Sequence, residues 1–594
     1  MKRIRSVAAT ALIVCALAVA TVAQVQVATA APGKQPTATG TGGAIATADL
    51  EASRAGLKVL RDGGNAVDAA VAAAAVLGVT EPFSCGIGGG GFMVIYRARD
   101  GKVTTVDHRE KAPRAMSPTS FFEGGSPLPF TAARFSGLSA GVPGTVEGWA
   151  KALDRYGTMS LGRALRPAIE VAREGFEVDQ VFFDQTQANV DFFNDIVSSE
   201  SLFLDSDGTP HDVGSTFANP DLARAYRRIA RLGTKGFYRG AIADEMVTAV
   251  QTPPLDSDAN HTWRPGVMTM RDLRAYTAPE RAPTRVGYRG VDVFGMGPPS
   301  SGGSTVGEAL NILEGFDLAG LPRELALHYY LEASRFSFAD RGAYLADPDF
   351  FDVPLEGLLS ESFAAERRSL ITEEAATSPV PPGDPYPHQS GSGSGGQASA
   401  TVTRAGTTTH LTVSDRWGNV VSYTFTIEST GGNGIVVPGW GFLLNNELTD
   451  FNFDSTTHPN RVEGGKRPRS SMSPTIVLDE GEPVLALGSP GGSMIITTVL
   501  QMLVNHFDFG MSLPDALAAA RLSQRNTPTT VVEPAFLGTA EAEDLEDRGH
   551  VFVPTPEIGA ATGIAFLPGG LVQAAAEPVR RGGGSAFVEN PAGP

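Results

Sequence analysis

Cysteine is nearly absent from this chain, which contains two in 594 residues. Cys15 lies in an N-terminal apolar run that we expect to be removed, so the mature chain keeps Cys85 alone. A single cysteine excludes an intramolecular disulfide as a stabilising element. We expect Cys85 to be a small buried apolar residue, because free cysteine is among the most buried residue types.

The first 30 residues have the composition of a secretory signal. Three basic residues within positions 1–5 precede an apolar run over 7–22, and small residues at 28–30 precede a cleavage site before Ala31. The sequence therefore predicts a signal peptide over 1–30 and a secreted location, extracellular or periplasmic. Lipid attachment at Cys15 and an uncleaved anchor are the alternatives.

Positive charge and histidine are also in short supply. The chain has 47 Lys and Arg against 65 Asp and Glu, a formal net charge of −18 at pH 7. A surface of that sign repels phosphate backbones, which argues against nucleic-acid binding.

No two of the nine histidines lie within ten positions of each other, so only distant residues could assemble a metal site. Gly86 to Gly91 lacks the Gly-Lys-Ser/Thr of a phosphate loop. We predict no metal and no cofactor.

The chain is rich in segments of both helical and strand type. Hydrophobic residues make up 42% of it and charged residues 19%, which is typical of a globular protein with a large core. Ala66 to Leu77 is almost entirely small and apolar, which predicts a helix packed closely against a sheet. Strand-type runs at 287–296, 474–478 and 484–487 alternate with helical blocks at 150–250 and 323–345. This pattern predicts a layered α/β architecture.

A threonine triplet follows a segment that carries no folding signal. Residues 380–407 are rich in proline, glycine and serine, which predicts a flexible and exposed stretch. Thr408 then stands at the start of a strand-type run. A cut at the end of the flexible segment would leave a threonine at a new N-terminus.

The strand that begins at this triplet belongs to a predicted hairpin. Turn residues at 415–419 separate it from a second strand-type run at 420–426. If the loop is centred on Trp417, Thr408 faces Thr426 at roughly 5 Å between Cβ atoms. Their two hydroxyl groups could then form a hydrogen bond.

An N-terminal threonine can be a nucleophile that carries its own base. Its α-amino group, with a pKa near ~8, can take the hydroxyl proton directly or through a water molecule. No distant histidine is then required. Threonine-rich runs are more often ordinary strands, so this stretch alone leaves both interpretations open.

Motifs over nearly the whole mature chain carry a family resemblance. They are Glu81-Pro82, Gly91-Phe92-Met93, Arg109-Glu110-Lys111-Ala112-Pro113, Gly141-Val142-Pro143-Gly144-Thr145, Pro299-Ser300-Ser301-Gly302-Gly303, Ala339-Asp340-Arg341, Thr408-Thr409-His410, Leu444-Asn445-Asn446-Glu447, Arg467-Pro468-Arg469-Ser470-Ser471-Met472-Ser473-Pro474 and Gly488-Ser489-Pro490-Gly491-Gly492-Ser493. With these motifs in this order, the chain resembles the gamma-glutamyltransferases of the N-terminal nucleophile hydrolase superfamily.

The resemblance implies a fold and a maturation step. The fold would be an αββα sandwich, made as a precursor that cuts itself before Thr408. The products would be a large subunit of about 31–407 and a small catalytic subunit of 408–594, which stay together as a heterodimer.

The resemblance also implies the catalytic residues. Thr408 would attack the γ-amide carbonyl of a glutathione-like donor and form a γ-glutamyl ester, which water or an amino-acid or peptide acceptor then resolves. Thr426 falls where the family has a threonine that positions the nucleophile. Gly491 and Gly492 match the oxyanion hole, in which backbone N–H groups stabilise the developing negative charge.

Five further residues suit the amino-acid end of such a donor. A guanidinium can bind a carboxylate with two hydrogen bonds, so Arg109 suits the α-carboxylate, with help from Ser470 and Ser471. The carboxylates of Glu447 and Asp450 suit the α-ammonium group.

Two features depart from the family pattern. Glu428 stands where many members have asparagine, and it adds negative charge near the expected position of the donor carboxylate. The stretch from Asp450 to Ser470 is too short for the lid loop of many bacterial members. An open pocket would admit larger leaving groups.

Three functions remain in competition at this stage. The leading hypothesis is a secreted γ-glutamyl hydrolase and transferase. The second is an acylase of the cephalosporin or glutaryl type that uses the same Thr408 nucleophile, which the two departures favour modestly. The third is a non-catalytic extracellular binding protein, which the presence of Thr408, Thr426, Gly491 and Gly492 disfavours.

Overall fold

The structure is a computed structural model that describes residues 33–390 and 406–592. The predicted signal peptide, 1–30, lies outside the described residues, and so does most of the predicted flexible segment, over 391–405. No helix within the described ranges has both the length and the apolar character that a membrane crossing requires. Cys85 is buried, as predicted, and it is a free cysteine.

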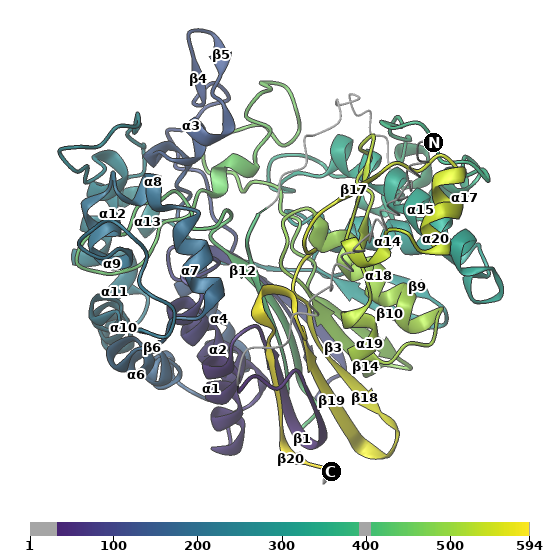
Figure 1. Cartoon of the computed structure of the whole chain (residues 1–594), viewed down its shortest axis with the longest axis horizontal. Coiled ribbons are helices and arrows are strands. Elements are labelled where there is room, and N and C mark those ends of the chain that lie inside the picture. The colour runs from purple at the N-terminus through teal and green to yellow at the C-terminus, as the bar shows by residue number, and fades with distance from the viewer. Residues whose placement is uncertain (1–32, 391–405, 593–594) are drawn as a thin grey trace, which may run out of the picture.

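A 13-stranded antiparallel sheet forms the centre of the molecule (Figure 1). Its strands follow in the order β8 (Glu280–Arg281), β3 (Lys102–Asp107), β2 (Gly90–Arg97), β12 (Val420–Thr426), β11 (Thr409–Ser414), β1 (Thr37–Thr47), β19 (Leu571–Ala576), β18 (Thr562–Leu567), β14 (Glu482–Gly488), β13 (Thr475–Asp479), β10 (Val291–Gly295) and β9 (Thr284–Tyr288). The last strand within the described residues, β20 (Ser585–Pro591), pairs with β1.

The sheet folds over so that its two halves face each other. Strands β11 and β12 contact β14 and β18, although they are not adjacent in the strand order. Ser422 Oγ of β12 donates a hydrogen bond to Leu487 O of β14 at 3.0 Å. Thr412 of β11 lies 3.5 Å from Thr562 of β18, measured between the two hydroxyl oxygens. Polar side chains of β11 and β12 therefore lie between the two halves.

Helices cover the outer face of each half. On one side, α1 (Leu50–Arg61) and α2 (Ala66–Thr80) pack on β1, β11 and β12. On the other, α14 (Gly302–Glu314) and α15 (Arg323–Tyr344) pack together, α14 covers β9 and β10, and α18 (Met494–Phe507) lies on β14. Figure 1 shows these two groups of helices on opposite sides of the strands. The predicted layered, mixed α/β architecture is confirmed, and the division into two subunits stays a prediction.

The remaining elements surround this framework. The helices are α3 (Phe130–Arg134), α4 (Thr145–Tyr156), α5 (Leu161–Ala164), α6 (Arg166–Glu174), α7 (Gln180–Gln187), α8 (Val190–Phe193), α9 (Val197–Phe203), α10 (Pro220–Leu232), α11 (Lys235–Tyr238), α12 (Ala241–Gln251), α13 (Met270–Arg274), α16 (Leu355–Leu358), α17 (Glu361–Arg368), α19 (Leu513–Ala518) and α20 (Ala540–Asp547). The short strands are β4 (Phe122–Glu123), β5 (Ser126–Pro127), β6 (Phe176–Glu177), β7 (Thr216–Phe217), β15 (Leu522–Ser523), β16 (Thr530–Val532) and β17 (Phe552–Pro554).

One strand prediction needs correction. The single strand-type run at 287–296 contains the end of β9, a turn and β10, and β9 pairs with β10 in a hairpin. The chain reverses at Arg289 and Gly290, which both have positive φ. Two consecutive residues of positive φ form the tight turns that fit the twist of a hairpin. Arg289 is an unusual residue for such a turn, which is why the sequence did not indicate one.

Helix α2 confirms the prediction for the alanine-rich run. It begins with a reciprocal cap, in which Asn65 and Asp68 each accept a hydrogen bond from the other's backbone N–H. All 15 of its residues are buried. Small side chains on every face let α2 contact α1, α6, β11 and β12 at once. The helix thereby becomes the centre of the larger apolar cluster.

The close packing of α2 makes a stability prediction. Ala72 is fully buried, so Ala72→Leu inserts three carbon atoms where no space exists. We expect the substitution to lower the free energy of unfolding by about 1–3 kcal/mol. Urea denaturation should show this loss, whereas Arg54→Leu at an exposed position of α1 should leave the stability nearly unchanged. Equal stabilities for the two variants would contradict the packing argument.

Candidate active site

The hairpin predicted around Trp417 is present with the predicted register. Strands β11 and β12 pair Thr409 with Phe425, so that Thr408 comes opposite Thr426. The hydroxyl oxygens of Thr408 and Thr426 lie 3.2 Å apart. Thr408 is 4% exposed. The predicted contact between the two hydroxyl groups is confirmed.

Both hydroxyl groups form hydrogen bonds with the peptide group that precedes Thr408. The carbonyl oxygen of Thr407 accepts a hydrogen bond from Thr408 Oγ1 at 2.7 Å and another from Thr426 Oγ1 at 2.8 Å. The backbone N–H of Glu428 donates to Thr426 Oγ1 at 2.8 Å, which turns the Thr426 proton toward Thr407. The Thr407 N–H donates to the carbonyl oxygen of Glu428 at 2.8 Å. This carbonyl group is therefore fixed and polarised beside a threonine hydroxyl.

Nine of the ten predicted site residues line one pocket. They are Arg109, Thr408, Thr426, Glu428, Glu447, Asp450, Ser470, Ser471 and Gly492. The tenth, Gly491, directly precedes Gly492. The pocket also contains residues that the sequence did not indicate, among them Arg341, Arg469 and Ser493.

The two glycines form the entrance to a helix. Gly491 and Gly492 have φ of 132° and 58°, values that L side chains rarely adopt. Their carbonyl groups accept hydrogen bonds from the first residues of α18, which starts at Met494. The positive end of a 14-residue helix thus lies at the pocket that holds Thr408. Negative charge that develops there is stabilised.

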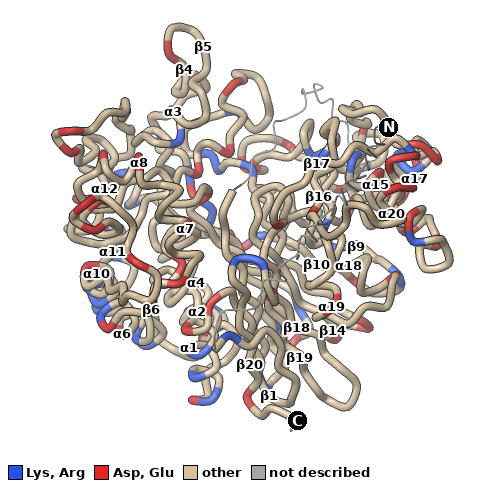
Figure 2. Tube along the Cα trace, viewed as in Figure 1, with Lys and Arg blue, Asp and Glu red and all other residues tan. Residues whose placement is uncertain are grey.

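Arg109 joins two acidic residues at the base of the pocket. Its guanidinium group forms ion pairs with Glu447 and, at 2.6 Å, with Asp450. It also donates to the carbonyl oxygens of Pro468 and Arg469, each at 3.2 Å. Burial alone would lower the pKa of Arg109, but the carboxylates of Glu447 and Asp450 raise it. Figure 2 shows that segments of both charge signs meet at the upper end of the strands in this view.

Carboxyl groups are crowded around this arginine. Glu110 lies 4.0 Å from Arg109, and burial raises its pKa to about 7, with Arg109 acting in the opposite direction. Burial also raises the pKa of Glu447 well above its usual range, and the neighbouring Glu110 adds to the effect. Burial and the neighbouring carboxyl group therefore both disfavour the charged form of Glu447. The sequence analysis had not assigned Glu110 to the site.

Glu428 is held in an uncommon conformation. Its φ of 79° is rare for a residue with a side chain. Its carboxyl group accepts hydrogen bonds from the Ser429 hydroxyl and the Asn446 amide. Burial and the charge of Asp450 raise its pKa to about 7. Glu428 therefore changes charge near neutral pH.

Residues from the helical layer that contains α14 and α15 form hydrogen bonds with Ser470 and Ser471. The Ser301 hydroxyl donates to the carbonyl oxygen of Ser470 at 2.6 Å. Ser470 Oγ accepts from the N–H of Met472 at 3.1 Å. Ser471 Oγ accepts from the guanidinium of Arg341 at 2.7 Å. Both serines line the pocket, and neither hydroxyl group donates a hydrogen bond to another residue within 33–390 and 406–592.

Comparisons with known proteins agree with this geometry. A family model described as Gamma-glutamyltranspeptidase matches residues 52–587. The glutathione hydrolase proenzyme of Bacillus subtilis (strain 168) is 39% identical over 534 residues, which cover 89% of this chain and 88% of that protein. The chain belongs to the gamma-glutamyltranspeptidase family.

Acylases are also similar to this member of the gamma-glutamyltranspeptidase family. The acylase ACY 1 proenzyme of Pseudomonas sp. (strain SE83) is 35% identical over 558 residues, covering 91% of this chain and 93% of that protein. The crystal structure of the cephalosporin acylase from Bacillus halodurans superimposes with a TM-score of 0.81 at 29% identity, covering 94% of this chain and 97% of that one. Family membership alone therefore does not decide the donor.

Long-range contacts explain which pocket residues the sequence analysis missed. Arg341 and Arg469 belong to motifs that support the family resemblance, but their positions do not indicate that the two side chains would meet. Arg469 donates to the backbone carbonyl oxygen of Arg341 at 3.1 Å, across 128 positions of the chain. Glu110 directly follows Arg109, which was predicted to bind substrate. This adjacency is the signal that could have indicated Glu110.

The pairing of Arg109 leads to a stability prediction. Arg109→Ala leaves the carboxylates of Glu447 and Asp450 without their cation. Removing one partner of a buried ion pair costs about 3–5 kcal/mol, and the partial exposure of Asp450 favours the lower end of this range. Chemical denaturation should show the loss, and Arg109→Lys, which keeps the charge, should lose less. A fully stable Arg109→Ala variant would contradict the assignment.

Proposed function

We propose that this protein is a secreted γ-glutamyl hydrolase and transferase that cuts itself before Thr408. The observation that carries the proposal is the placement of two threonine hydroxyl groups on the Thr407 carbonyl, inside a pocket with paired acidic and basic groups. The glutathione hydrolase proenzyme from Bacillus subtilis supports it, since proenzymes are processed and that relative spans almost the whole chain.

Self-cleavage begins at the Thr407–Thr408 peptide bond. Thr408 Oγ1 attacks the carbonyl carbon of Thr407, and the hydroxyl proton passes to the departing nitrogen. Thr426 Oγ1 donates to the oxygen that becomes negative in this step. The carbon–nitrogen bond then breaks and leaves an ester on Thr408. Water hydrolyses the ester, which releases residues up to 407 as one chain and 408–594 as another.

The new N-terminus then supplies the base for turnover. The free α-amino group of Thr408 takes the hydroxyl proton as Oγ1 attacks the γ-carbonyl carbon of the donor. The N–H groups at Gly491 and Gly492 stabilise the tetrahedral oxyanion. The departing amine takes up the proton, and a γ-glutamyl ester remains on Thr408. Water or the amino group of an acceptor resolves this ester and restores the enzyme.

The amino-acid end of the donor lies among the charged residues. Arg109, Ser470 and Ser471 receive its α-carboxylate, and Glu447 and Asp450 receive its α-ammonium group. A zwitterion is suited to this pocket because acidic and basic side chains line it together.

An acylase that accepts glutaryl or cephalosporin donors is the second candidate. The ACY 1 proenzyme and the cephalosporin acylase are similar to almost the whole chain. The stretch after Asp450 is short: its Phe451 lines the pocket, and His458 Nε2 lies 3.0 Å from the carbonyl oxygen of Gly342 near the end of α15. Charge favours γ-glutamyl donors over glutaryl donors, since the acidic residues attract an ammonium group that a glutaryl chain lacks.

Maturation is the first test of the proposal. Denaturing electrophoresis should resolve two chains, and the smaller should begin Thr-Thr-His. Thr408→Ala should remain a single, inactive chain. Thr426→Val should slow self-cleavage by about 10²–10³-fold, as expected for the loss of an oxyanion donor, whereas Thr426→Ser should cut at nearly the normal rate. A smaller chain that begins at Thr407 or Thr409 would assign the nucleophile to another residue.

Glu428 provides a pH-dependent test of donor binding. We expect Glu428→Asn to lower the KM for a γ-glutamyl anilide, because a carboxylate near the donor's α-carboxylate is removed. Since the pKa of Glu428 is raised to about 7, this carboxyl group is mostly neutral at pH 6 and mostly charged at pH 8. The benefit should therefore be larger at pH 8. Steady-state kinetics of the wild type and of Glu428→Asn at pH 6 and pH 8 measure this benefit. The ratio of the two KM values at each pH removes the effect of Glu110, which titrates in both proteins. A higher KM in the variant would mean that Glu428 attracts the donor instead.

A further inference from the structure

A half-buried arginine supports the turn that contains Gly491 and Gly492. Arg525 Nη1 donates a hydrogen bond to Ser493 Oγ at 2.7 Å. Ser493 follows Gly492 directly and precedes the first residue of α18. Ser493 lines the pocket that holds Thr408, whereas Arg525 lies behind this lining. Arg525 therefore acts on the pocket through another residue.

The charge of Arg525 has no counter-ion. Burial lowers its pKa to about 10, and no carboxylate within residues 33–390 and 406–592 raises it again, so the group stays charged at neutral pH. Its Nε is buried and has no hydrogen-bond partner among these residues. A buried cation without a partner is costly, and the positive end of a helix disfavours cations further. Such an arrangement is typical of groups that serve the chemistry of a site.

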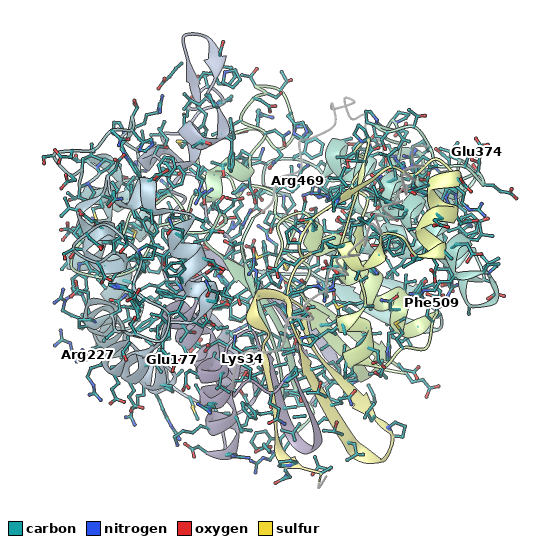
Figure 3. All side chains as sticks on the ribbon, in the orientation of Figure 1. Lys34, Glu177, Arg227, Glu374, Arg469 and Phe509 are labelled. Atoms are coloured by element: carbon teal, nitrogen blue, oxygen red, sulfur yellow. The ribbon has the colours of Figure 1, made fainter. Side chains whose placement is uncertain are left out.

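Helix α18 carries this positive end into the pocket. Its first residues line the pocket together with Arg469. In Figure 3, the labelled Arg469 lies near the middle of the molecule, and Phe509, just beyond the end of α18, lies toward the edge. The helix therefore runs outward from the pocket, and Arg525 adds its charge at the inner end.

Hydrogen bonds on both sides of Arg525 fix its backbone. The carbonyl oxygen of Gln524 accepts from Ser334 Oγ of α15 at 2.6 Å. Asn526 Oδ1 accepts from the backbone N–H of Val380 at 2.7 Å, and Asn526 Nδ2 donates to the carbonyl oxygen of Val380 at 3.0 Å. The guanidinium group is therefore held out from a fixed support.

The glycine pair depends on such a support for its direction. The carbonyl oxygens of Gly491 and Gly492 accept from the N–H groups of Met494 and Ile495, each at 3.1 Å. Among the described residues, none accepts a hydrogen bond from the N–H of either glycine. Glycine has no side chain that could hold its own backbone. The side chain of Ser493 is the first after the pair that can anchor the turn.

We infer that Arg525 is a positioning residue for the oxyanion hole. Through Ser493 it fixes the N–H groups of Gly491 and Gly492, and its charge stabilises the negative oxygen that forms on the donor carbonyl. The inference rests on the proposed function, in which these two glycines form that hole. Formation and resolution of the γ-glutamyl ester both pass through such an oxygen, so Arg525 assists both steps.

Self-cleavage does not use this hole. The oxygen that becomes negative in that step belongs to Thr407, and its hydrogen bonds come from Thr408 and Thr426. A change at Arg525 should therefore slow turnover and leave maturation unaffected. A residue that only stabilises the fold would not separate the two reactions.

The test measures both reactions in the same variants. In Arg525→Gln, we expect kcat for a γ-glutamyl anilide to fall by about tenfold, as for the loss of a charged hydrogen bond, with KM within about twofold of the wild type. The half-time of self-cleavage, followed by denaturing electrophoresis, should also stay within about twofold. Arg525→Lys keeps the charge and should recover part of the loss. Arg285→Gln is the matched control, because Arg285 is an exposed arginine of β9 paired with Asp292.

The other results count against the role of Arg525. An unchanged kcat would exclude it, a raised KM with normal kcat would make Arg525 a donor-binding group, and equal slowing of both reactions would make it a structural residue. If Arg525→Gln does not fold, Ser493→Ala provides the same comparison, because it removes the hydroxyl group that Arg525 holds. Failure of the proposed function looks different: the wild-type chain would then remain uncut or inactive toward the γ-glutamyl anilide.

Discussion

The alternation of side chains along β11 and β12 is the constraint on which the site depends. Leu411, Val413, Val421, Tyr423 and Phe425 have odd numbers and pack into the apolar cluster under α1 and α2. Apart from Val420, the even-numbered residues of both strands carry hydroxyl or imidazole groups, and this row lies between the two halves of the sheet. Thr408 and Thr426 are the outermost members of this polar row. A slip of one residue would place the hydroxyl groups against the helices, so burial of the odd face fixes the geometry of the nucleophile.

This constraint is local, which explains how much of the site could be predicted. Period-two alternation and turn residues predicted the hairpin, its register and the contact between Thr408 and Thr426. The alanine-rich composition likewise predicted the close packing of α2. Such features depend on neighbours within about 20 positions, and the sequence displays them directly.

Contacts between distant segments could not be predicted in this way. Arg109 meets Glu447 and Asp450 across more than 300 positions, and only the family resemblance had brought the three together. His328 and His550, far apart in sequence, lie 2.9 Å apart between ring nitrogens in the layer that contains α15. The roles of the charged residues also depend on how they compensate one another. Motif positions name Arg109 as a carboxylate ligand, but only the structure shows that its guanidinium group also pairs with Glu447 and Asp450.

The strand order has a consequence for how the molecule can be assembled. Residues 44–47 in β1 pair with β11 on one edge, and the same strand pairs with β20, which contains the last described residues of the chain. The central sheet therefore joins strands that lie more than 500 positions apart, as in the pairing of Ala44 with Val588. Contacts of such large sequence separation also slow folding. Strand β1, which borders the hairpin that carries Thr408, is therefore held on its other side by a contact that is slow to form.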